Sequence, residues 1–125
     1  MKIFRKRINE IMGKFVNKNL ILYSPTANFF GQESKKTRQI RGNGMLILME
    51  NKIYFEMWKP KKTLEIPIDK IFNISTPKSY LKKSKFRPLL KIHFKNDENE
   101  NDSAAWLVKD LNNWRGNIKK LMEAK

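Results

Sequence analysis

The chain has 125 residues, of which 40% are hydrophobic and 11% aromatic, enough for one domain with a substantial core. It has no cysteine, which excludes disulfides, thiolate nucleophiles and cysteine-ligated zinc. No apolar run approaches the ~20 residues that span a bilayer, and no secretory apolar segment follows the basic N-terminus, so we expect a cytoplasmic protein. Lys+Arg number 27 against 12 Asp+Glu, a net charge of +15, which favours anionic partners.

The first 17 residues predict an amphipathic helix. The apolar residues on its one face are Phe4, Ile8, Ile11, Met12 and Phe15, and cations crowd its start. Cations at a helix N-terminus oppose the helix dipole, so they are badly placed for helix stability alone. The helix can dock its apolar stripe on the domain, lie on a membrane surface, or act as a targeting or partner-binding segment. We divide the chain into this helix, 1–18, and a domain, 19–125.

From Leu20 onward the apolar period changes to two, which predicts six or seven short antiparallel strands. They are expected at 20–23, 27–31, 45–49, 53–58, 64–68, 71–75, 90–94 and 104–108, where Pro25 bends or restarts the first strand and the last segment could instead begin the final helix. In 53–58, Ile53, Phe55 and Met57 face one side, and Tyr54, Glu56 and Trp58 face the other. Pro67 donates no ladder hydrogen bond, which places its strand at an edge or an end.

The C-terminal stretch predicts a second helix. Asp110 is its expected N-cap, and the apolar positions at helical spacing are Leu111, Trp114, Ile118, Leu121 and Met122. Short strands at regular spacing followed by a helix indicate a mainly β (α+β) fold, a small barrel or sandwich.

The stretches "GNGMLILMENKIYFEMW" and "LEIPIDKI" resemble the central strands of PH-like domains, particularly GRAM and related bacterial PH-like modules. The residues that carry the resemblance are Gly44, Leu46, Leu48, Ile53, Phe55, Ile66, Pro67 and Ile71. The closing helix with Trp114 resembles the helix that plugs one end of the PH barrel. The resemblance covers roughly residues 19 to 122 and implies a partly open barrel of about seven antiparallel strands with a C-terminal capping helix, to which this chain adds its N-terminal amphipathic helix.

The resemblance also implies that three loops gather at the open end of the barrel. In this chain they are 32–43, 59–62 and 96–102, and the first two supply the predicted anion-binding residues Lys35, Lys36, Arg38, Lys59, Lys61 and Lys62. The third loop brings four carboxylates, Asp97, Glu98, Glu100 and Asp102, to the same rim. It thereby departs from a simple phosphoinositide pocket.

No constellation of residues indicates catalysis. His93, the single histidine, alternates onto the outer face with Lys91 and Lys95, and no partner for a catalytic or metal role accompanies it. The acidic run at 97–102 lacks the glycine and terminal glutamate of a calcium loop. The Gly-Asn-Gly at 42–44 leads into a strand rather than a helix, unlike a phosphate-binding loop. We therefore predict no enzyme activity, no cofactor and no metal.

Trp58 lies on the outer face beside the basic turn Lys59-Pro60-Lys61-Lys62. It can cover the N-terminal helix, in an interface with Phe4, Ile8 and Ile11, or contact a membrane or a nucleic-acid base. Three functions remain open: peripheral binding to anionic lipid headgroups through the basic loops, binding to an acidic protein surface, and nonspecific nucleic-acid binding. Because the basic residues are scattered and no nucleic-acid-binding motif is present, the third ranks last.

Overall fold

The computed structural model describes residues 9–10, 13, 20–35, 41–58, 62–80, 83–84 and 87–124. They form a mainly β fold in which seven antiparallel strands build one open sheet in the order β4-β3-β2-β1-β9-β8-β5. The strands are β1 (Leu20–Gln32), β2 (Gly42–Met49), β3 (Lys52–Met57), β4 (Lys62–Pro67), β5 (Ile71–Ser75), β8 (Leu90–Lys95) and β9 (Asn101–Leu107). A separate two-stranded ribbon pairs β6 (Ser79–Tyr80) with β7 (Lys83–Ser84). The predicted β class is confirmed.

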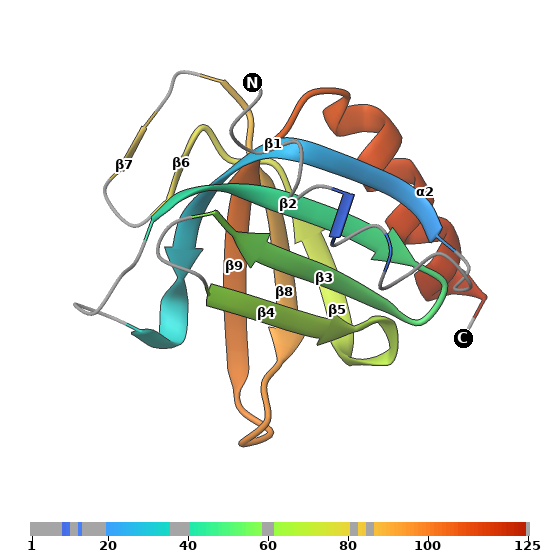
Figure 1. Ribbon diagram of the computed structural model, residues 1–125. Helices are drawn as coiled ribbons and strands as arrows, with labels where there is room; N and C mark the ends of the chain where they lie inside the picture. The colour runs from blue at the N-terminus through green and yellow to red at the C-terminus, as the bar shows by residue number, and fades with distance from the viewer. Residues whose placement is uncertain are drawn as a thin grey trace.

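β1 is one strand, although the sequence allowed Pro25 to break it. It pairs with β2 on one side and with β9 on the other, and its register shifts between Ser24 and Ala27 and again between Phe29 and Gly31. Such irregularities bend a strand and increase its twist. Figure 1 shows the result: β1 curves over the molecule, so that β2, β3 and β4 cross steeply in front of β9, β8 and β5.

The core fills the space between these two halves of the sheet. Phe29, Phe55 and Trp106 meet at its centre with ring centroids 5.0 to 5.7 Å apart. The residues predicted to share one face of 53–58, Ile53, Phe55 and Met57, are buried in this cluster together with Ile66, Leu90, Ile92 and Phe94. The strand at 104–108 is also real, because β9 carries Ala104 and Trp106 inward rather than beginning a helix.

α2 (Leu111–Glu123) packs on one end of this core, where Trp114 and Ile118 are buried. The helix begins one residue after Asp110, as predicted, but the predicted cap is only half right. The Asp110 side chain makes no capping hydrogen bond, and its backbone is left-handed with φ 54°. The Asp110 carbonyl instead accepts hydrogen bonds from the amides of Asn113 and Trp114.

Two further predictions concern the edge strand and the N-terminal helix. β4 is an edge strand that ends at Pro67, as the missing N–H of that residue predicts. Most of the predicted N-terminal helix, including Phe4, Ile8 and Ile11, lies outside the described residues. In the part of the chain that the structure describes, no helix is long and apolar enough to cross a membrane.

Candidate functional site: a rim of three loops

Asp102 joins two of the three predicted rim loops. Its carboxylate accepts hydrogen bonds from Gln32 Nε2 at 2.7 Å and from the Ser34 amide at 3.0 Å. Asn96 Nδ2 lies 3.4 Å away across the hairpin between β8 and β9. The end of β1 and the start of η1 (Glu33–Lys35) are thereby fixed against this hairpin.

This geometry corrects the expectation that all four carboxylates of the loop 96–102 lie at the rim. Asp102 is only 2% exposed, whereas Asp97, Glu98 and Glu100 are exposed. Asp102 pairs with Phe94, a core residue, so its side chain points toward the inner end of the sheet. The sequence contained the signal, because residue 102 shares the alternation of Ala104 and Trp106.

The hydrogen bonds also determine the charge state of Asp102. Burial alone would raise the pKa of this carboxyl group, but the bonds from Gln32, Ser34 and Ser103 outweigh burial and hold its pKa below the ordinary 3.8. The group is therefore an anion at neutral pH. Its negatively charged oxygens accept hydrogen bonds within the fold, and these bonds hold the ends of the two loops together.

The rim loop 59–62 begins beside the end of the rim loop 32–43. The Trp58 amide donates a 3.0 Å hydrogen bond to the Asn43 carbonyl, and Met57 pairs with both Gly44 and Lys62. The chain therefore enters and leaves the basic turn next to the residue that ends the first basic loop. Arg41 in that first loop donates from Nε to the Phe30 carbonyl over 2.8 Å.

Most of the predicted anion-binding side chains are not placed. Lys36, Arg38, Lys59 and Lys61 lie outside the described residues, and Lys35 is described by its backbone alone. Lys62 starts β4 and is half-buried. The structure therefore describes the ends of the two basic loops, and the anion-binding role of these residues stays a prediction.

A cavity of about 300 Å³ opens between β4 and the hairpin from β8 to β9. Its walls include Leu64 and Phe94, and both signs of charge line it, with Lys70 and Lys95 beside Glu65 and Asp97. Sequence reasoning missed this cavity, because β4 and β8 do not pair with each other and only the bend in the sheet brings them together. Its mixed charge makes it a poor match for a simple anion.

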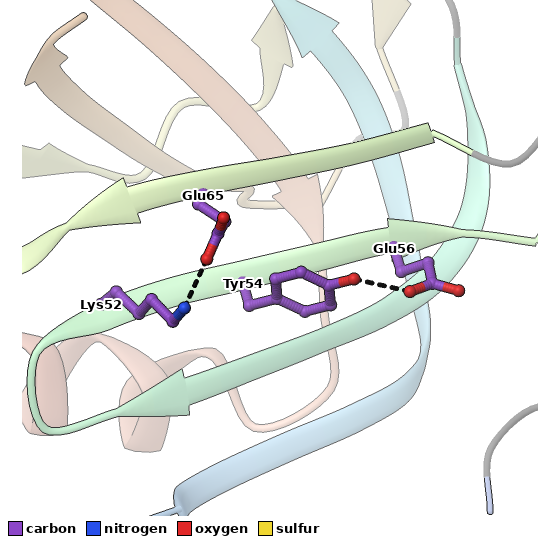
Figure 2. Close-up of polar contacts among 4 residues, drawn as sticks. All are labelled: Lys52, Tyr54, Glu56 and Glu65. Atoms are coloured by element: carbon purple, nitrogen blue, oxygen red, sulfur yellow. Dashed lines mark hydrogen bonds and ion pairs between the residues drawn. The ribbon is translucent and has the colours of Figure 1, made fainter. Parts of the chain in front are cut away.

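The outer face of β2 and β3 carries a second apolar cluster, which we call the outer cluster: Met45, Ile47, Met49, Tyr54 and Trp58. Trp58 is 5% exposed and donates from Nε1 to the Pro25 carbonyl over 3.2 Å. Within the same face Tyr54 Oη donates to Glu56 Oε1 at 2.6 Å, as Figure 2 shows. Figure 2 also shows the ion pair between Lys52 and Glu65 on the neighbouring part of that face. The predicted outward orientation of Tyr54, Glu56 and Trp58 is confirmed, but these residues are buried.

His93 lies on the outer face of the other half of the sheet. It forms a 2.9 Å hydrogen bond through Nε2 with Ser75 Oγ. Partial burial and the nearby Lys91 lower the pKa of His93 below 6.5, and Glu33 opposes them. The imidazole is thus neutral at pH 7. Among the described residues, no group of three or more His, Cys, Asp or Glu side chains could hold a metal ion.

No family model and no curated protein matches this chain. Its fold is nevertheless similar to solved structures. One is a chain of the 8S snRNP assembly intermediate, with a TM-score of 0.64 and 6% identity over 86% of this chain and 84% of that one. Another is the C-terminal domain of an unknown protein from Leishmania infantum, with a TM-score of 0.62 and 12% identity over 95% and 97% of the two chains. At such identities the similarity concerns the fold alone.

Proposed function

We propose that this protein is a non-catalytic binding module of the PH-like type that associates peripherally with anionic membrane surfaces from the cytoplasm through its basic rim. The observation that carries the proposal is the hydrogen bond between Trp58 and Asn43. It joins the residue before the turn 59–61 to the residue that ends the loop 32–43, and the sequences of 36–40 and 59–61 together contain four cations and no acid. The bent open sheet with α2 at one end supports the PH-like assignment.

The distribution of carboxylates supports an anionic partner. Asp102 is withdrawn into the fold, Glu56 is buried against Tyr54, and Glu65 is paired with Lys52. The acidic loop 96–102 therefore places three rather than four of its carboxylates at the rim. Attraction between the remaining cations and a charged membrane surface is worth about 1 kcal/mol per Lys or Arg.

A protein-binding role is the second candidate, with an acidic protein surface as the partner. Two observations favour it: the cavity between β4 and the hairpin carries both signs of charge, and one protein of similar fold belongs to an assembly intermediate. A mixed-charge, partly apolar cavity suits a protein side chain better than a phosphate group.

A binding titration separates the candidates. The full chain is mixed with vesicles of neutral lipid, vesicles containing anionic lipid, and a random oligonucleotide, each over a series of salt concentrations. We expect binding to the anionic vesicles that weakens as salt increases, and none to neutral vesicles. The absence of binding to anionic vesicles at low salt would refute the lipid role, and tighter oligonucleotide binding with a steep salt dependence would replace it by nucleic-acid binding.

A further inference from the structure

The outer cluster is buried although it faces away from the core. Met45 and Ile47 are 0% exposed and Met49 is 4% exposed, on the face of β2 opposite Leu46 and Leu48. An outer sheet face without a cover is open to water. Something therefore covers this face.

The covered area is a narrow strip with exposed borders. Tyr23, which pairs with Ile47 from the β1 side, is 51% exposed. On the β4 side Thr63, which pairs with Glu56, is also exposed. The strip is thus two strands wide, ~10 Å at the usual strand spacing, which is close to the ~10–12 Å diameter of one α-helix with its side chains.

We propose that the N-terminal segment, residues 1–19, docks as a helix on the outer cluster and forms its cover. The chain leads directly there, because Leu20, the first residue of β1, packs on this cluster. The other stretches outside the described residues, 36–40, 59–61, 81–82 and 85–86, contain at most one large apolar residue each. Only the N-terminal segment has enough apolar side chains to cover the strip.

The orientation of the segment agrees with this arrangement. Asn9, Glu10 and Gly13 have helical backbone and are exposed. At about 3.6 residues per turn, these positions lie on the side of a helix opposite Ile8, Ile11 and Phe15. A helix that docks with residues 9, 10 and 13 outward turns its apolar stripe toward the sheet.

Charge complementarity supports the same occupant. Glu56 lies within the strip, is 2% exposed, and accepts a hydrogen bond from Tyr54. A carboxylate within the strip favours an occupant that brings positive charge. The cations of the N-terminal segment are Lys2, Arg5, Lys6, Arg7, Lys14 and Lys18.

The first test compares two double variants of the full chain that add the same charge to the segment. Ile8→Asp with Ile11→Asp places carboxylates in the stripe, whereas Asn9→Asp with Gly13→Asp places them on the exposed side, where an added Cβ of residue 13 meets nothing within 4 Å. Trp58, Trp106 and Trp114 are all buried, so the native fluorescence resists acrylamide. We expect the stripe variant alone to gain a quenchable component, which Trp58→Phe in the same background removes. Equal shielding of both variants would overturn the proposal.

A second test does not disturb the packing and decides the case where the stripe variant fails to fold. Because the chain has no cysteine, Asn9→Cys can be combined with Thr63→Cys, at the border of the strip, or with Phe72→Cys, which is 50% exposed on β5. A short bis-maleimide should link residue 9 to residue 63 several-fold faster than to residue 72. Equal rates for the two pairs would overturn the proposal, whatever the vesicle titration shows.

Discussion

Gln32 and Asp102 are 70 residues apart in the sequence, yet the Gln32 side-chain amide donates to the Asp102 carboxylate over 2.7 Å. This bond, with the one from the Ser34 amide, ties the end of β1 to the start of β9. A charged acceptor with several donors is a strong local restraint, since hydrogen bonds to ions exceed neutral ones in strength.

Replacing Asp102 with Ala should therefore destabilise the protein. The substitution removes the acceptor of the part-buried Gln32 side-chain amide and of the buried Ser103 backbone amide, a cost of about 1–3 kcal/mol. Urea unfolding measures the change. Asp97→Ala, on the exposed part of the same hairpin, serves as the control and should change stability by less than ~0.5 kcal/mol. Equal effects of the two variants would contradict the structural role of Asp102.

The same carboxylate should make stability depend on acid pH. Its pKa is below 3.8 in the fold, so between that lowered value and 3.8 the unfolded chain binds more protons than the folded one. The contribution of Asp102 to the free energy of unfolding is complete above pH 3.8 and is lost as the pH falls through the folded pKa. Asp102→Asn should flatten the acid side of the stability curve, measured as unfolding midpoints in urea from pH 7 downward. An unchanged slope would show that the carboxylate is not stabilised by folding.

His93 offers a direct spectroscopic check, because it is the single histidine and its ring signals in NMR are unambiguous. Burial and Lys91 lower its pKa, and Glu33 raises it. A titration should give a pKa below 6.5, Lys91→Gln should raise it, and Glu33→Gln should lower it further. Shifts of the opposite sign would contradict the described surroundings.

The pH dependence from His93 lies in a different window. A histidine whose folded pKa is depressed binds fewer protons than in the unfolded chain just below pH 6.5. Its stabilising contribution is full above pH 6.5 and disappears as the pH falls through the folded pKa. His93→Gln should remove this part of the stability profile in unfolding experiments, and a profile unchanged in that window would argue against it.

Replacing a glycine by alanine should have opposite effects on stability in the sheet and in α2. A Cβ at Gly44 would lie 2.7 Å from the Phe55 ring and clash with the Glu56 carbonyl, whereas one at Gly116 in α2 would meet nothing within 4 Å. Gly44→Ala should cost about 1–3 kcal/mol, as overpacking does. Gly116→Ala should stabilise the protein by about 0.5–1 kcal/mol, because alanine favours a helix. Thermal unfolding of both variants measures the contrast, and similar shifts in midpoint would contradict it.

Much of the fold was predictable from alternation alone. Ile53, Phe55 and Met57 are in the core because a strand with one buried face repeats every two residues. Local pattern could not reveal the continuity of β1 through Pro25, because pairing with β2 on one side and β9 on the other maintains it. Local pattern also could not reveal that the Asp110 side chain makes no capping hydrogen bond, since that follows from the left-handed backbone at this residue.

The site was less predictable than the fold. Runs of Lys and Arg indicated the basic loops. Because Asp102 ends a run of acidic residues, its burial was not evident from the sequence. The alternation in β3 showed Trp58 facing outward, and only the structure shows that this outward face is covered. Burial on an outer face depends on a partner distant in sequence, and a local pattern contains no information about that distance.

The basic rim, rather than the total charge of the protein, should bind anionic membranes. The measurement is vesicle co-sedimentation of two triple variants with the same change in charge: Lys59→Glu, Lys61→Glu and Lys62→Glu at the rim, and Lys109→Glu, Arg115→Glu and Lys119→Glu at exposed positions in and beside α2, which lies on the other side of the molecule in Figure 1. We expect the rim variant to lose at least tenfold in affinity, as about 1 kcal/mol per cation implies, and the α2 variant to bind nearly as the unmodified protein does. Equal losses in the two variants would contradict the claim.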